Sequence, residues 1–80
     1  MDKNQAIEHI NAALRSAIKD PKASVKPGSD LLEDGVLDSL DGLVFLMELS
    51  TSTGKQFPEK DPKEQGFFKV DKLVEYITAD

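Results

Sequence analysis

The chain has 80 residues, of which 39% are hydrophobic, and a formal net charge of −5. This length predicts one domain, spanning residues 1–80, with a small core. An acidic chain repels nucleic acid phosphates, so no nucleic acid partner is expected. There is no cysteine, which excludes disulfides and thiolate metal sites. No apolar run approaches the roughly 18 residues of a membrane span, and the first residues lack a secretory signal pattern, so we predict a cytoplasmic protein.

Apolar residues near the N-terminus recur at steps of three and four, which places them on one face of a helix. They are Ala6, Ile7, Ile10, Ala13, Leu14, Ala17 and Ile18. The pattern predicts a helix over about 4–18, with Asn4 as its N-cap and Pro21 preventing its extension.

A long connection containing prolines and glycines follows, from about 19 to 38. A loop of this length in so small a domain is expected to be functional or to carry its own packing residues. The candidates for packing are Val25, Leu31, Leu32, Val36 and Leu37.

The most apolar segment predicts a second helix over about 39–53. Its expected main core contacts are Leu40, Leu43, Val44 and Met47, with Phe45, Leu46 and Leu49 as further candidates. Asp38 is a suitable N-cap, because its carboxylate can accept backbone N–H groups of the first turn, and Gly54 fits a left-handed stop. Gly42 leaves a bare patch beside Ser39, which either receives the packing of the loop or gives a partner room.

The breakers Pro62 and Gly66 limit the segment after Phe57-Pro58 to one or two short turns. A last helix is predicted over about 70–78, with Tyr76 partly exposed. It is expected to bury Val70, Leu73, Val74 and Ile77. The predicted fold is therefore all-α: a small bundle of three main helices plus one short helix, with a long loop between helix one and helix two.

Charge is distributed unevenly along the chain. Between residues 27 and 54 there are six acidic residues and no lysine or arginine, whereas the rest of the chain has nine acidic and ten basic residues. The six are Asp30, Glu33, Asp34, Asp38, Asp41 and Glu48. A field of one sign attracts proteins with basic patches; the alternative is a solvated face that only keeps the protein soluble.

Few side chains suit catalysis. His9 is the only histidine, about thirty positions from Ser39, and no G-x-S-x-G turn surrounds that serine. We therefore predict no catalytic triad, with His9 a surface or half-buried residue.

A calcium loop is the metal site to consider, because Asp30 to Asp41 spans twelve residues. Asp34 and Gly35 occupy its fifth and sixth positions. Leu32 at the third position and the short Asp41 at the twelfth do not fit, since such loops use Asp or Asn and a bidentate Glu there. We predict no specific metal site, with only weak divalent binding by the acids left open.

Ser39 lies where the predicted second helix begins. The free N–H groups and the macrodipole of a helix N-terminus favour an anion, so a phosphodiester on Ser39 would be stabilised by the backbone. Asp38 and Asp41 would repel it. By residue type alone, a role confined to the helix cap is the simpler explanation.

The motif Asp38-Ser39-Leu40-Asp41, after a turn at Gly35 and before an apolar helix, resembles the phosphopantetheine attachment site of acyl carrier proteins. The resemblance covers most of the chain, including the stripe of the first helix, the long loop and the closing helix. It implies that Ser39 receives 4'-phosphopantetheine from coenzyme A through a phosphopantetheinyl transferase. The thiol of this arm would hold acyl intermediates as thioesters.

The resemblance also implies a non-enzymatic phosphoprotein of lipid metabolism that delivers acyl groups to fatty-acid or polyketide-type biosynthetic enzymes. The implied docking residues are Asp38, Leu40, Asp41 and Glu48. The implied partners, besides the transferase, are acyl-processing synthase, dehydratase and transferase enzymes with basic docking patches, and the carrier itself is expected to be a monomer. Docking through exposed charge pairs is weak and salt-sensitive, at about 0 to 1 kcal/mol per pair.

Several features depart from the usual fatty-acid carriers, among them a slightly longer segment between Pro58 and Val70. Val36 and Leu37 stand between the turn glycine and the motif, where those carriers usually have one residue; this spacing is similar to D-alanyl and some peptidyl carriers. Val44, Ser50 and Thr51 stand where fatty-acid carriers commonly place glutamates. A specialised carrier is therefore expected.

Acyl cargo is preferred at this stage, with aminoacyl or peptidyl cargo, for example D-alanyl, as the alternative. An alternative of another class is an unmodified acidic protein-interaction module. A further hypothesis is an apolar gap for an acyl chain; the residues in question, which would otherwise be ordinary core, are Phe45, Met47, Phe57, Phe67 and Phe68.

Overall fold

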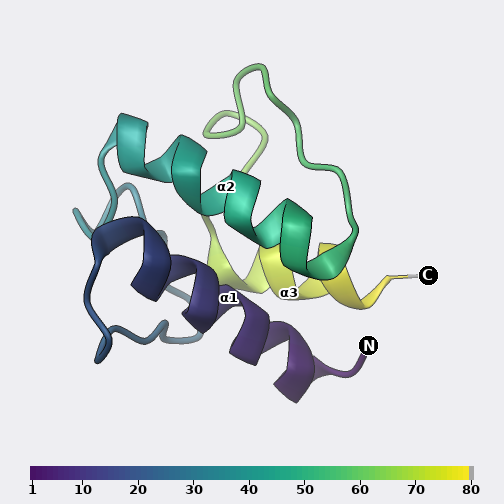
Figure 1. The fold of residues 1–80 in the computed structure, drawn as a ribbon. Coiled ribbons are helices and arrows are strands. Elements are labelled where there is room, and N and C mark those ends of the chain that lie inside the picture. Colours follow the sequence, from purple (N-terminus) through teal and green to yellow (C-terminus); the bar gives the residue numbers. More distant parts are fainter. Residues whose placement is uncertain (80) are drawn as a thin grey trace.

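A computed structural model describes residues 1–79 of the chain. In this range three helices and no strand are present: α1 (Lys3–Ile18), α2 (Ser39–Thr53) and α3 (Val70–Thr78). Figure 1 shows α1 and α2 side by side and antiparallel, with α3 crossing behind them. The structure confirms the small all-α bundle and the long connection between its first two helices. No helix within residues 1–79 is long and apolar enough to cross a membrane.

The N-terminus of α1 is capped by Asp2, and the prediction of Asn4 as N-cap was wrong. The Asp2 carboxylate accepts the Gln5 backbone N–H at 2.8 Å, and the Gln5 side-chain oxygen accepts the Asp2 backbone N–H at 3.1 Å. This reciprocal capping box requires a glutamine or glutamate three residues after the cap, and only Asp2 has one. The helix therefore starts one residue earlier than predicted, at Lys3.

The predicted stripe of α1 forms one wall of the core. Its buried residues are Ala6, Ile10, Ala13, Leu14 and Ala17. Ile7 and Ile18 lie at its edges, half-buried against the core. α1 packs on α2 and less extensively on α3. Three of its buried residues are alanines, whose small side chains let the neighbouring helices approach α1 closely.

The face that α2 buries is not the one predicted. Its buried residues are Gly42, Phe45, Leu46 and Leu49. The four expected main core contacts are instead exposed: Leu40 (73%), Leu43 (46%), Val44 (39%) and Met47 (69%). Phe45 and Leu49 are fully buried, so α2 is held by the residues that were only further candidates. The prediction placed the right helix with the wrong side inward.

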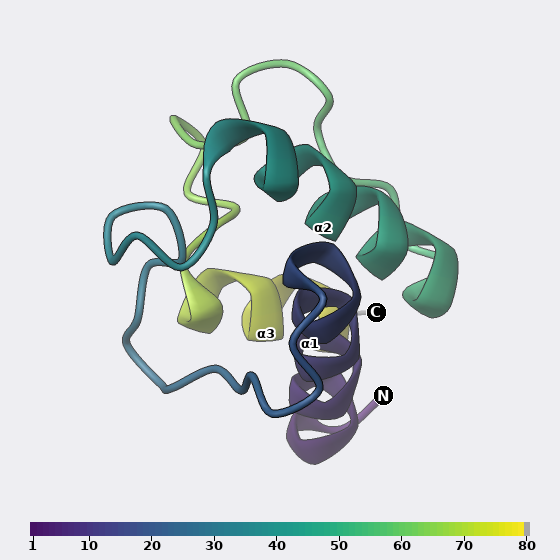
Figure 2. The same cartoon turned by 60° about the vertical axis from the view of Figure 1, so that its left-hand side comes forward.

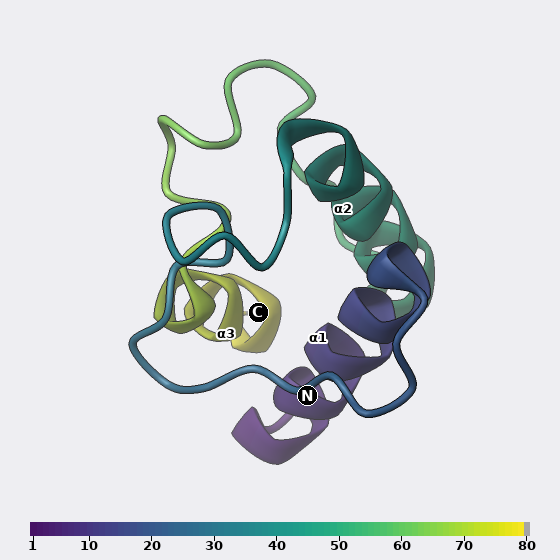
Figure 3. The same cartoon turned by 90° about the vertical axis from the view of Figure 1, so that its left-hand side faces the viewer.

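The long 19–38 loop is anchored by backbone hydrogen bonds to the segment that leads into α3 (Figure 2, Figure 3). Leu31 N–H donates to the Phe68 carbonyl at 2.8 Å, and Val70 N–H donates to the Ser29 carbonyl at 2.9 Å. Of the predicted anchors, Leu31 and Leu37 are buried, and Val25 and Leu32 are half-buried. Val36 is 39% exposed, so its prediction as an anchor was wrong.

The expected short fourth helix is present only as consecutive turns over residues 62–68, because Gly66 has a left-handed backbone (φ 81°) that a continuous helix does not contain. Phe57, Phe67 and Tyr76 form an aromatic cluster in which Phe67 and Tyr76 meet edge to face, with ring centroids 5.1 Å apart. The predicted inward face of α3 is confirmed, and Tyr76 is partly exposed as predicted.

Candidate functional site

Ser39 is the first residue of α2 and is exposed. The residue before it, Asp38, is the N-cap as predicted: its extended backbone turns the chain into the helix and its carboxylate accepts the Asp41 N–H at 2.7 Å. The Asp38 carbonyl accepts the Gly42 N–H at 2.8 Å. Within residues 1–79, Ser39 Oγ makes no hydrogen bond, so the cap is satisfied without it.

His9 does not approach Ser39. Its Nδ1 lies 3.1 Å from the Ser52 hydroxyl, near the opposite end of α2. Ser52 lies thirteen positions after Ser39 in the helix, which is about 20 Å along the axis. The single histidine is half-buried, as predicted, and the fold does not bring a base to the serine.

A row of exposed apolar side chains begins beside Ser39 and follows the helix. We call it the outer face of α2 and define it by Leu40, Leu43, Val44 and Met47. Asp41 and Glu48 flank it, one half-buried and one exposed. An apolar row on a helix flanked by acidic residues is a surface suited to another protein. Of the four predicted docking residues, Leu40, Asp41 and Glu48 lie on or next to this row, and Asp38 is the N-cap before α2.

The remaining acidic residues of the 27–54 stretch mainly organise the loop. The Asp30 carboxylate accepts the N–H groups of Leu32 and Glu33, both at 3.0 Å. Asp34 accepts the Ser29 hydroxyl. Glu33 lies 4.0 Å from Lys63, the one ion pair among residues 1–79, and both side chains are mostly exposed. Nowhere in that range do three or more acidic or histidine side chains converge as metal ligands would.

Gly42 is buried under Phe68. A Cβ at this position would lie 3.0 Å from Cε1 and Cζ of that ring, and 3.7 Å from Leu32 Cδ2. Of the two explanations for this glycine, close packing is confirmed. The bare patch beside Ser39 is filled from inside the protein.

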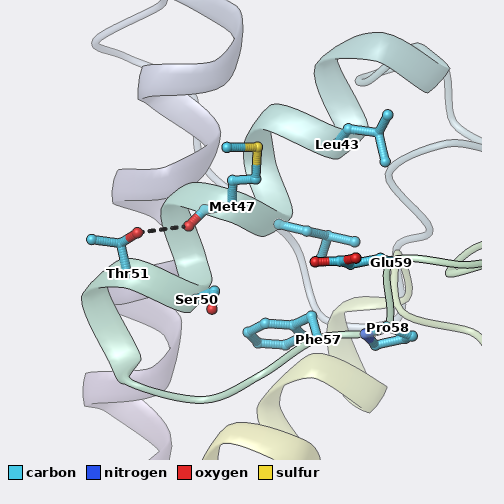
Figure 4. Close-up of a pocket in the computed structure, with 8 residues that line it drawn as sticks. Leu43, Met47, Ser50, Thr51, Phe57, Pro58 and Glu59 are labelled. Carbon is cyan, nitrogen blue, oxygen red and sulfur yellow. Dashed lines mark hydrogen bonds between the residues drawn. The ribbon is translucent and has the colours of Figure 1, made fainter.

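A pocket of about 500 Å³ lies between α2 and residues 57–59 (Figure 4). Its lining residues are Leu43, Leu46, Met47, Ser50, Thr51, Phe57, Pro58 and Glu59. Of the five residues predicted to border a gap, Met47 and Phe57 line this pocket, whereas Phe45, Phe67 and Phe68 are core. Glu59 was not predicted as a site residue, because it lies in a segment without helical periodicity and only the fold brings it to α2.

The pocket begins one helical turn from Ser39. Its α2 residues lie four, seven, eight, eleven and twelve positions after that serine, which is the spacing of one face of a helix. A group attached to Ser39 is therefore on the same face of α2 as the pocket, one helical turn before its first lining residue.

Neither the known protein families, nor the curated proteins, nor the solved structures compared with this chain gave a match. The chemical case for the site depends on its own geometry.

Proposed function

We propose that this protein is a carrier whose Ser39 bears a covalent 4'-phosphopantetheine arm. The observation that supports the proposal most is the hydroxyl of Ser39: it is exposed, makes no hydrogen bond within the described residues, and stands at the first position of α2. When bound, the group supplies a thiol that holds an acyl cargo as a thioester.

The surroundings of Ser39 fit a phosphodiester at Oγ. The first turn of α2 presents backbone N–H groups and the positive end of the helix dipole, which favour an anion. Asp38 already satisfies one of these N–H groups and opposes the anion by its charge. Attraction by the helix N-terminus and repulsion by Asp38 therefore partly cancel. A covalently attached phosphate tolerates this, because it needs no tight non-covalent site.

The outer face of α2 is the proposed docking surface for the transferase and for the enzymes that process the cargo. Leu40 is 73% exposed directly beside Ser39, so a partner that reaches the serine covers this side chain. Asp41 and Glu48 flank the row and would steer a basic patch toward it. Apolar contact then supplies most of the affinity, while the exposed charges mainly raise the rate of encounter.

An unmodified acidic interaction module is the second candidate, because the same outer face would serve it equally well. The two candidates differ in the need for Ser39. A module that only binds proteins has no use for an unpaired hydroxyl at the start of the helix, and Ser39→Ala would leave its binding unchanged.

The test is to incubate the pure protein with coenzyme A, magnesium and a promiscuous phosphopantetheinyl transferase, and to measure its intact mass. In the expected reaction Ser39 Oγ bonds to the phosphorus of the phosphopantetheine, adenosine 3',5'-bisphosphate leaves, and the serine proton passes to the transferase. We expect the mass of a single phosphopantetheine to be added, and Ser39→Ala to abolish this addition. The control variant Ser29→Ala, which removes a serine hydroxyl from the 19–38 loop, should still be loaded. No change in mass would favour the interaction module.

A further inference from the structure

The pocket between α2 and residues 57–59 offers hydrogen-bond acceptors and no free side-chain donor. Ser50 and Thr51 are the only lining residues with a donor group. The Ser50 hydroxyl donates to the Lys55 carbonyl at 2.7 Å, and the Thr51 hydroxyl donates to the Met47 carbonyl at 3.0 Å (Figure 4). A hydroxyl has one hydrogen to give, so both present only lone pairs to a further partner.

The third polar side chain of the pocket is the carboxylate of Glu59, which is also an acceptor. Glu59 is exposed and, within residues 1–79, has no ion-pair partner, because the one ion pair in that range joins Lys63 and Glu33. Figure 4 shows its carboxylate turned from its own segment toward α2. No lysine or arginine lines the pocket.

Glu59 is the one ionisable residue in the lining of this pocket, and Lys60 lines the adjoining hollow that shares Ser50 and Glu59. α2 has no basic residue along its whole length, and its acidic residues Asp41 and Glu48 lie on the side of the helix away from the pocket. The site therefore suits a ligand with a positive end and hydrogen-bond donors, and it opposes a carboxylate. The rest of the lining is hydrocarbon from Leu43, Leu46 and Phe57, which suits an apolar body.

We infer that the pocket receives a cargo bearing a protonated amine, that is, an aminoacyl group held on the Ser39 arm, with Glu59 as the residue that selects it. The inference deepens the proposed function and rests on it. The ammonium lies at Glu59 and the Ser50 lone pairs, and the hydrocarbon part of the cargo lies on the apolar lining. This cargo class is the alternative to the acyl cargo that the resemblance favoured.

Attachment of the cargo to Ser39 allows an exposed pocket to bind it in spite of a weak intrinsic affinity. A carboxylate and an ammonium in water attract each other only weakly, so a free amine would bind poorly. A cargo attached at residue 39 is held near the pocket at high effective concentration, and a weak preference then decides where the cargo rests. The far end of the pocket, Thr51, is twelve residues along α2, or about 18 Å, so the tether must span that length.

The test attaches cargo chemically and so does not need the transferase. The chain has no cysteine, so Ser39→Cys provides a single thiol. It is alkylated with three haloacetamide linkers of equal length, long enough to span about 18 Å, that end in an ammonium, a methyl or a carboxylate group. Backbone amide shifts of Ser50, Phe57 and Glu59 are then measured by NMR.

We expect the ammonium linker to shift these amides, with about two- to fivefold higher occupancy of the pocket than the methyl linker, and the carboxylate linker to leave them unchanged. Glu59→Gln should reduce the ammonium shifts to those of the methyl linker. Glu64→Gln, an exposed residue of the same segment that does not line the pocket, should have no effect. Equal shifts from the methyl and ammonium linkers, or full ammonium shifts in Glu59→Gln, would overturn the inference.

The outcome is separable from that of the proposed function. If coenzyme A loading fails while the ammonium linker still selects the pocket, the carrier proposal is wrong but the selectivity of the pocket stands. If loading succeeds and the linkers show no difference, the protein is a carrier whose cargo is not chosen at Glu59.

Discussion

The ring of Phe68 packs directly on the backbone of Gly42, so closely that a Cβ there would lie 3.0 Å from two ring carbons. This contact joins the first turn of α2, where Ser39 stands, to the segment that enters α3. It also fixes the rotation of α2, because the side that carries Gly42 must face Phe68. The outer face and the exposure of Ser39 follow from that rotation.

Gly42→Ala should destabilise the protein by about 1 kcal/mol. Overpacking a core typically costs about 1–3 kcal/mol, and the better helix propensity of alanine offsets up to about 1 kcal/mol of it. Urea denaturation measures the change. In a Phe68→Leu background the clash is relieved, so the same substitution should become stabilising there; an unchanged cost in both backgrounds would refute the role of this contact.

Asp38→Ala should cost about 0.5–2 kcal/mol, because the Asp41 N–H loses its 2.7 Å acceptor. Asp38→Asn keeps an acceptor and should retain most of the stability. The pair separates two roles of this residue: if the charge of Asp38 steers partners, Asp38→Asn loads more slowly with phosphopantetheine although it stays folded. Thermal unfolding and loading rates, measured on the same samples, check both. If Asp38→Asn and Asp38→Ala were equally destabilised, the side-chain hydrogen bond to the Asp41 N–H would not be what Asp38 contributes to stability.

Substitutions on the outer face of α2 should affect partners and not the fold. Leu40→Ala and Met47→Ala, at 73% and 69% exposure, should change the free energy of unfolding by less than about 0.5 kcal/mol. Leu49→Ala, at 0% exposure on the opposite side, should cost about 2–5 kcal/mol. We expect Leu40→Ala to load more slowly. A large loss of stability in Leu40→Ala would show that this face is buried after all.

Tyr76→Phe should loosen the segment before the pocket. The Tyr76 hydroxyl donates to the Gln56 carbonyl, and removal of such a bond costs about 0.5–1.5 kcal/mol. The ring remains, so its contacts with Phe57 and Phe67 are retained. Hydrogen exchange should become faster for the amides around residues 55–57 and stay unchanged in α1. Unchanged exchange at the segment would indicate that the aromatic cluster alone holds it.

The bounds of α2 could be predicted from the sequence because they depend on local signals, whereas α3 has no side-chain cap and its predicted bounds follow from the spacing of its buried residues. Asp38 and Gly54 mark the ends of α2, and the structure has both caps where they were expected. At α1 two nearby polar residues, Asp2 and Asn4, are both of a type that caps helices, and the choice of Asp2 depends on Gln5, which completes a capping box.

The orientation of α2 could not be predicted from periodicity. Its buried set is Gly42, Phe45, Leu46 and Leu49, and its exposed set is Leu40, Leu43, Val44 and Met47. Both sets have successive spacings of three, one and three, so each forms an equally good helical face. The difference comes from Phe68, far away in sequence, which needs the space that only a glycine leaves. The same limit applies to Glu59, whose position beside α2 depends on the path of the chain after Phe57.

The proposed covalent arm on Ser39 can be tested by the mass spectrum of the peptide containing this residue, from protein isolated from its native cells. We expect a phosphopantetheine adduct located on Ser39, with a labile thioester on a fraction of the molecules. A peptide that is uniformly unmodified at Ser39, from cells in which the protein is abundant, would contradict it.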